Sequence, residues 1–68
     1  MRYCIIVFDE KTGKFEKEGF VNEAGSPEDA LKIAISLFPT KEIHAYEIQN
    51  DKTLKEVKIF KNGDYVNE

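Results

Sequence analysis

The chain has 68 residues, of which 41% are hydrophobic and 34% are charged, and its formal net charge is −3 at pH 7. This length and composition predict one folded domain over residues 1–68, near the lower size limit for a core without disulfides or metal, and they exclude a disordered tail. The acidic balance argues against nucleic acid or an anionic membrane as the default partner, since both are bound mainly through basic surface.

Cysteine usage and the apolar runs favour a protein of a reducing compartment. Cys4 is the only cysteine, so no internal disulfide can form, and we expect a cytoplasmic location. No run in the sequence approaches the roughly 20 apolar residues of a membrane span. The apolar run near the start, residues 3–8, leads directly into Asp9 and Glu10 and is interpreted as a strand rather than as a targeting segment.

The first strand is apolar at every position from 3 to 8, which is typical of a central strand covered on both faces. A turn-forming stretch follows and predicts a hairpin with residues 15–21. Pairing Phe8 with Phe15 sorts this hairpin into two faces. One face holds Cys4, Ile6, Phe8, Phe15 and Val21, and the other holds Tyr3, Ile5, Val7 and Phe20 beside Glu16 and Glu18. We expect a helix to cover the first of these faces.

One run has helical periodicity, from Ser26 to Phe38. Ser26 is a favourable N-cap, Pro27 suits the first helical position, and Pro39 ends the run. At about 100° per residue, one apolar stripe is formed by Leu31, Ala34, Ile35 and Phe38. Ile33 and Leu37 lie on the outer arc, so the outer surface of the helix is a second candidate contact surface.

Residues 42–50 and 54–61 predict a second hairpin. Its expected register pairs Asn50 with Lys55, which places two residue pairs on the side assigned to the core and two on the other side, where the pair of Glu47 with Lys58 belongs to the charged rim. The core pairs are Ile48 with Val57 and Tyr46 with Ile59, and the second pair on the other side is Ala45 with Phe60. Asn62-Gly63 is the strongest two-residue hairpin signal and predicts a short fifth strand over residues 64–66.

These elements predict an α+β fold of order ββαββ(β), in which a single helix packs on one face of a four- or five-stranded antiparallel sheet. A right-handed crossover through the helix places the third strand beside the first. The strand order is then 2-1-3-4, with the fifth strand outside the fourth where it forms. We expect the core between helix and sheet to contain Leu31, Ala34, Phe38, Ile6, Phe8, Ile48 and Ile59.

The residue types that most often carry catalysis or bind metals are few. Cys4 and His44 are the only residues of their kinds, and no Cys-x-x-Cys or His-x-x-x-His spacing exists. A buried structural cysteine and a surface or strand-end histidine are the expected roles. The sequence therefore predicts no catalytic residue, no metal ligand and no cofactor, and the pair of Cys4 with His44 is a weak alternative.

The sheet face turned away from the expected helix is the candidate functional surface. It should present apolar and aromatic side chains with a charged rim, which is typical of an interface. The candidate interface residues are Tyr3, Ile5, Val7, Phe20, Ile43, Phe60, Glu16 and Glu18. The first hypothesis is therefore a small non-enzymatic interaction module, which pairs with itself as a homodimer or docks on a larger protein as an inhibitor or adaptor.

Two alternatives come from other functional classes. Tyr3, Phe20 and Phe60 would stack the bases of a single-stranded nucleic acid, although the acidic balance disfavours that partner. An enzyme would need a deep pocket that shifts the pKa of His44 or Cys4. The sign of the electrostatic potential over the open face separates the first hypothesis from nucleic-acid binding.

Overall fold

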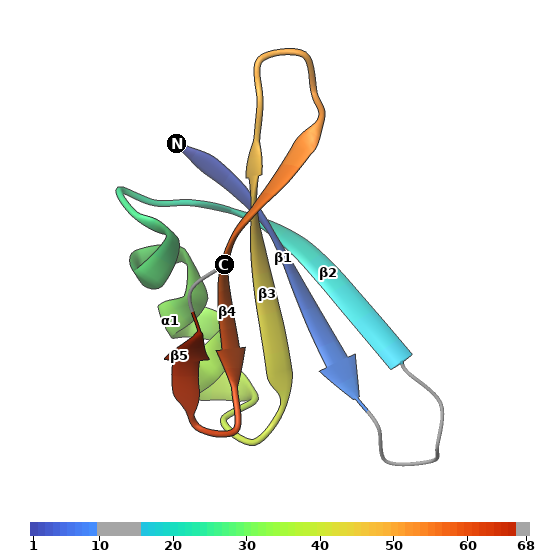
Figure 1. Cartoon of the computed structure of the whole chain (residues 1–68), viewed down its shortest axis with the longest axis vertical. Helices are drawn as coiled ribbons and strands as arrows, with labels where there is room; N and C mark the ends of the chain where they lie inside the picture. Colours follow the sequence, from blue (N-terminus) through green and yellow to red (C-terminus); the bar gives the residue numbers. More distant parts are fainter. Residues whose placement is uncertain (10–15, 67–68) are drawn as a thin grey trace.

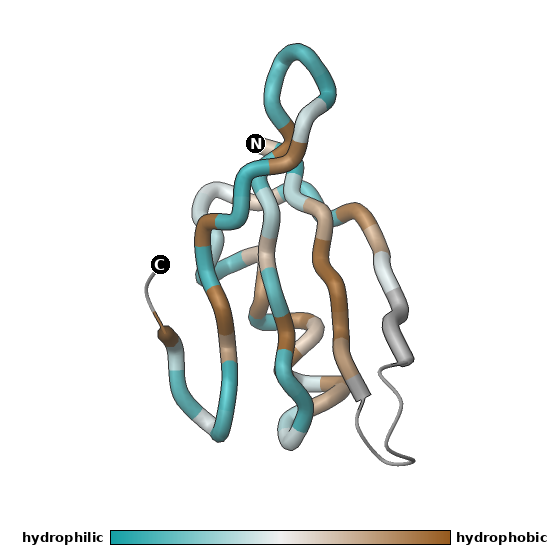
Figure 2. The backbone as a smooth tube through the Cα atoms, turned by 45° about the vertical axis from the view of Figure 1, so that its right-hand side comes forward, coloured by the Kyte–Doolittle hydropathy of each residue, from teal (hydrophilic) through white to brown (hydrophobic). Residues whose placement is uncertain are grey.

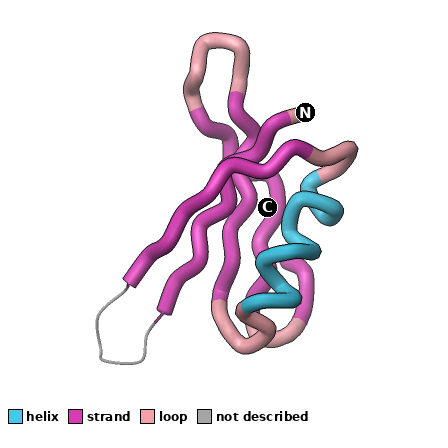
Figure 3. Tube along the Cα trace, turned by 180° about the vertical axis from the view of Figure 1, so that it is seen from behind, coloured by secondary structure: helices cyan, strands magenta, loops and turns pink. Residues whose placement is uncertain are grey.

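The computed structural model describes residues 1–9 and 16–66, and of residues 9 and 16–18 it describes the backbone. The elements are β1 (Arg2–Asp9), β2 (Glu16–Glu23), α1 (Pro27–Leu37), β3 (Glu42–Ile48), β4 (Leu54–Lys61) and β5 (Asp64–Val66). The five strands form one antiparallel sheet in the order β2-β1-β3-β4-β5, and α1 lies against one face of it (Figure 1; Figure 3). The predicted fold class, element order and strand order are confirmed.

The limits of α1 follow from its capping residues. The Ser26 side chain accepts a hydrogen bond of 3.2 Å from the backbone N–H of Asp29, and Pro27 occupies the first helical turn. At the other end, Phe38 is the C-cap, and its N–H donates to the Ala34 carbonyl oxygen over 2.8 Å. With 11 residues, α1 cannot cross a membrane, and none of the described residues form a helix that could.

Two turns in the second half of the chain use left-handed backbone. Asn62 and Gly63 have φ values of 55° and 80°, which are those of the two-residue turn predicted between β4 and β5. In the β3–β4 turn the left-handed residue is Lys52, with φ of 68°. The Asp51 carboxylate accepts hydrogen bonds from the Thr53 N–H and hydroxyl over 3.1 and 2.6 Å, so side-chain bonds complete this turn.

The first hairpin pairs two residues away from the predicted register, and the second pairs two residues away near Phe60 but three residues away from Tyr46 onward. Ile5 lies opposite Phe20 on β2, and Ile43 lies opposite Phe60 on β4. A shift of two residues leaves side chains on their original face, because the side-chain period of a strand is two. The predicted division into two faces is therefore correct for the described part of the first hairpin, although its register is wrong. In the second hairpin it fails at Val57, which packs against the core while its predicted partner Ile48 lies on the other face. The predicted fifth strand forms as β5, on which Tyr65 pairs with Phe60.

The β3–β4 ladder contains a bulge. Ala45 lies opposite Lys58, but the next residue, Tyr46, lies opposite Glu56, so Val57 is outside the ladder. In a regular strand, Glu56 and Lys58 would point to the same face. The extra residue instead turns Glu56 to the face of Tyr46, away from α1.

The helix covers the face that the sequence analysis left open. Buried sheet residues on this face are Tyr3, Ile5, Val7, Ile43, Ala45 and Phe60, and the buried residues of α1 are Ala30, Leu31 and Ala34. The helix covers this face because the opposite face of β3 carries Glu42 and His44, whose burial under a helix would need further partners. Small alanine side chains on both layers allow α1 to lie close to β3.

The expected core is therefore only partly correct. Leu31 and Ala34 are buried as predicted, and Phe38 is half-buried against the core. The four sheet residues of that expectation, Ile6, Phe8, Ile48 and Ile59, are half-buried on the face without a helix. The reason lies in β1, which is hydrophobic along most of its length and so gives no alternation that identifies its core side (Figure 2).

Candidate functional site

The residues predicted to form an open interface lie in the core instead. Tyr3, Ile5, Val7, Ile43 and Phe60 are between 0% and 8% exposed, beneath α1. Phe20 is half-buried and packs against the same core. Glu16 and Glu18 belong to β2, but their side chains fall outside the described residues, as does Phe15. The predicted face is wrong, because the faces of the first hairpin were divided correctly but the helix was assigned to the other one.

The opposite surface of the sheet carries the exposed apolar side chains. We call it the helix-free face, and its central residues are Cys4, Ile6, Phe8, Val21, His44, Tyr46, Ile48, Leu54 and Ile59. Val21 and Leu54 are 55% and 51% exposed, and the others are half-buried by their neighbours on the flat sheet. Each strand from β2 to β4 thus contributes apolar area to one continuous surface.

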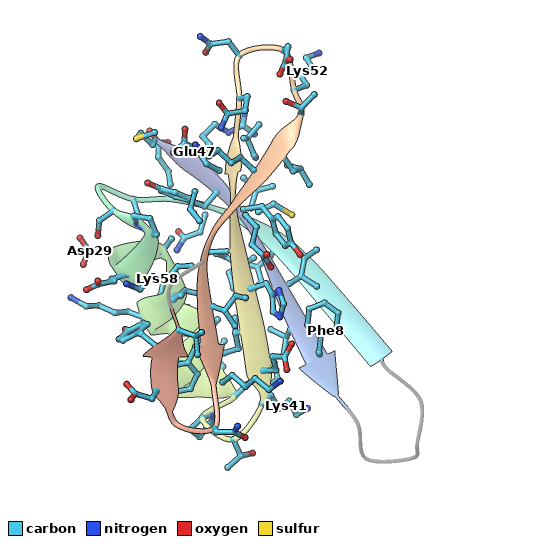
Figure 4. All side chains as sticks on the ribbon, viewed as in Figure 1. Phe8, Asp29, Lys41, Glu47, Lys52 and Lys58 are labelled. Carbon is cyan, nitrogen blue, oxygen red and sulfur yellow. The ribbon has the colours of Figure 1, made fainter. Side chains whose placement is uncertain are left out.

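Three rings lie side by side on this face. The Phe8 and His44 ring centroids are 4.7 Å apart at an interplanar angle of 58°, and those of His44 and Tyr46 are 6.2 Å apart at 22°. Phe8 lies near the end of β1, on the opposite side of the picture from α1 (Figure 4). We call this set the aromatic row. Such spacings are those of interacting aromatic pairs.

Two carboxylates hold His44 from opposite sides. Its Nδ1 is 2.5 Å from Oε1 of Glu56, and its Nε2 is 2.5 Å from Oε2 of Glu42. The other oxygen of Glu42 is 3.4 Å from Nζ of Lys61. The hydrogen bond with His44, assisted by the positive charges of His44 and Lys61, lowers the pKa of the Glu42 carboxyl below its usual value. We call these four residues the carboxylate–histidine cluster.

The cluster is partly withdrawn from water. The His44 side chain is 14% exposed, and those of Glu42 and Glu56 are 27% and 25% exposed. Glu56 reaches His44 because the β4 bulge turns it to this face. Charge-assisted hydrogen bonds of this kind are stronger than neutral ones, so the cluster links β3 to β4 beside the aromatic row.

The geometry argues against the Cys4–His44 pair as a nucleophile and base. Both ring nitrogens of His44 are engaged by carboxylates, so neither is directed at the Cys4 thiol. Cys4 is half-buried on the helix-free face rather than buried under the helix, which corrects the expected structural role. A groove of about 570 Å³ at the end of the sheet is lined by other residues: Met1, Arg2, Glu47, Ile48, Gln49, Asn50 and Lys52.

Metal binding finds no support in the part of the chain that the structure describes. In residues 1–9 and 16–66, no group of three histidine, cysteine, aspartate or glutamate side chains could hold a metal ion. In the cluster, Glu42 and Glu56 approach different nitrogens of His44, so the three side chains do not converge on one point.

Sequence reasoning missed the carboxylate–histidine cluster. Part of it was readable, because Glu42 and His44 alternate with the apolar Ile43 and Ala45, which marks their side of β3 as the solvent side. The contribution of Glu56 was not readable, since it depends on a bulge for which neither glycine nor proline gives a signal.

Comparison of the chain with protein-family models, with curated proteins and with solved structures finds no match in any of the three. The support for a function therefore comes from the helix-free face, with its apolar strands, its aromatic row and its carboxylate–histidine cluster.

Proposed function

We propose that the protein is a small non-enzymatic interaction module that binds another protein through the helix-free face, either a second copy of itself or a larger target. The supporting observation is the apolar surface from β2 to β4 that no other described element covers. Sheets with two apolar faces are normally covered on both. The single thiol of Cys4, half-buried and without a disulfide, suits a reducing compartment, and we propose the cytoplasm.

The size of the helix-free face indicates the kind of complex to expect. Four strands of about seven residues give the helix-free face a flat area of roughly 450 Å². This is below the ~800 Å² per partner of a standard interface, so we expect a weak and reversible complex unless the partner also covers neighbouring surface.

The test compares two charge insertions. Ile6→Glu places a carboxylate in the middle of the helix-free face, whereas Ile33→Glu places one on the outer side of α1, where Ile33 is 54% exposed. We expect Ile6→Glu to abolish association, seen by light scattering over a concentration series and by recovery of partners from the native host. Ile33→Glu should leave association unchanged, and both variants should stay folded by circular dichroism.

Two results would contradict the proposal. One is a protein that remains monomeric near ~1 mM and recovers the same partners with and without Ile6→Glu. The other is loss of association with Ile33→Glu alone, which would move the interface to the outer surface of α1, where Leu37 is also exposed.

The aromatic row favours one second candidate, a binder of single-stranded nucleic acid. Phe8, His44 and Tyr46 offer ring faces on an open sheet, which is how such sheets stack bases. The carboxylates of Glu42 and Glu56 lie beside the same row and would repel phosphates. Fluorescence anisotropy with a labelled oligonucleotide tests this candidate: binding that weakens with salt and is lost in Phe8→Ala would support it.

A further inference from the structure

The carboxylate–histidine cluster needs a donor at both nitrogens of His44. A neutral imidazole has one N–H and one lone pair, whereas the imidazolium has two N–H groups. The structure places a carboxylate oxygen 2.5 Å from each nitrogen, so the arrangement suits the imidazolium. In the neutral ring, one of the two carboxylates would face a lone pair and be repelled.

We propose that this cluster is a proton-operated clamp on the helix-free face. With His44 protonated, the ring joins Glu42 on β3 to Glu56 on β4. With His44 neutral, the clamp releases Glu56, which turns toward solvent. Residues 54–57 of β4 are then less firmly attached to β3. The inference concerns the free protein and does not depend on the proposed function.

Glu56 is released rather than Glu42 because their other contacts differ. Glu42 has a second partner, the Lys61 ammonium at 3.4 Å, which holds it in place whatever the charge of His44. The described contact of the Glu56 carboxylate is to His44. Neutral His44 can therefore keep its single N–H on Nε2 for Glu42 and present its lone pair to Glu56.

The surrounding groups give the clamp two charge states. Glu42, Glu56, His44 and Lys61 sum to zero with His44 protonated and to −1 with His44 neutral. From β1 the ring of Phe8 packs on His44, and the thiol of Cys4 lies on the same face. From β3 itself the ring of Tyr46 lies beside His44, with centroids 6.2 Å apart. Releasing a proton thus exposes an uncompensated carboxylate beside the aromatic row.

The experiment is a nuclear magnetic resonance titration of the full chain from about pH 5 to about pH 8.5, the range in which histidines usually change charge. The ring nitrogens of His44 and the carboxyl carbons of Glu42 and Glu56 are followed together. We expect the Glu56 signal to move with the same midpoint as the His44 ring and the Glu42 signal to move much less. After correction for intrinsic rates, amide exchange in residues 54–57 should be about tenfold faster when His44 is neutral than when it is protonated. The reason is that one charge-assisted hydrogen bond, from His44 to Glu56, is then lost.

Glu56→Gln is the matched variant, because a side-chain amide can accept from an N–H or donate to a lone pair. In Glu56→Gln, exchange in residues 54–57 should no longer depend on the charge of His44, whereas Glu42→Gln should keep that dependence. The clamp is refuted by a Glu56 signal that stays constant through the His44 titration, by a His44 ring that keeps one charge state over the whole range, or by acceleration that persists in Glu56→Gln.

Discussion

Two neighbouring isoleucines in β1 provide a direct test of which sheet face the helix covers. Ile5 is 0% exposed beneath α1, and Ile6 is half-buried on the helix-free face. Truncation of a buried isoleucine to alanine typically costs ~2–5 kcal/mol, whereas a half-exposed site typically loses about 1 kcal/mol. Ile5→Ala should therefore be the more destabilising change by at least ~1 kcal/mol.

The pair is well matched, because both residues lie in the same central strand and lose the same atoms. Differences in strand propensity and in the unfolded chain therefore cancel when Ile5→Ala is compared with Ile6→Ala. A domain of this length has a total stability of roughly 3–10 kcal/mol, so Ile5→Ala removes a large share of it and Ile6→Ala does not. Urea unfolding followed by circular dichroism measures both values. An equal or larger loss for Ile6→Ala would show that the helix covers the other face.

Three further predictions follow from single contacts. The Cys4 thiol, half-buried on the helix-free face, should react with a disulfide reagent in the native protein, and a rate that tracks global unfolding would show instead that it is buried. The pKa of Glu42 is lowered by its hydrogen bond with His44, so this carboxyl contributes stability above its ordinary pKa, and the contribution is lost as the pH falls through the folded-state pKa. Urea midpoints measured from neutral pH down to about pH 3 should therefore fall less steeply in Glu42→Gln than in the parent, and parallel curves would contradict this. Ser26→Ala should cost about 1 kcal/mol in the same assay through loss of the cap on α1, while Ser26→Asp should retain most of the stability.

The features that were predictable from the sequence are those set by local chemistry. Ser26, Pro27 and Pro39 limit the helix through capping and backbone geometry, and these effects act within a few residues. Asn62-Gly63 specifies its turn in the same way, since both residues accept a positive φ. Strand order followed from short connections and from the handedness of the crossover.

The face covered by the helix was not predictable from β1, because all its residues from 3 to 8 are apolar. The second hairpin misled the assignment, since Lys58 was interpreted as a marker of the solvent side. In the structure, Lys58 lies on the helix side and pairs with Glu28 of α1 over 3.1 Å, with only 15% of its side chain exposed. A long side chain at the helix margin can bury its stem and still bring its ammonium to a carboxylate.

The predicted site depended on which sheet face the helix was expected to cover. Because that face was wrong, residues predicted for the site lie in the core and residues predicted for the core lie on the helix-free face. The predicted Tyr3, Ile5 and Val7 and the observed Cys4, Ile6 and Phe8 are alternate positions of one strand. The alternation in β3 carried the better information, because charged Glu42 lies next to fully buried Ile43. Assigning the solvent side from that polar pattern would have identified the face without a helix.

The bulge in β4 determines where this strand can change in length. Because Val57 lies outside the ladder, deleting it would leave Glu56 and Leu54 on the face that they occupy now. If the bulge is kept, deleting a residue from 58–61 would turn every residue between the deletion and the β3–β4 turn to the opposite face. In an alignment of this chain with a homologue, a one-residue gap at Val57 is therefore consistent with the carboxylate–histidine cluster, whereas a gap at residues 58–61 in a strand that keeps the bulge is a sign that the pairing of Glu56 with His44 has been lost.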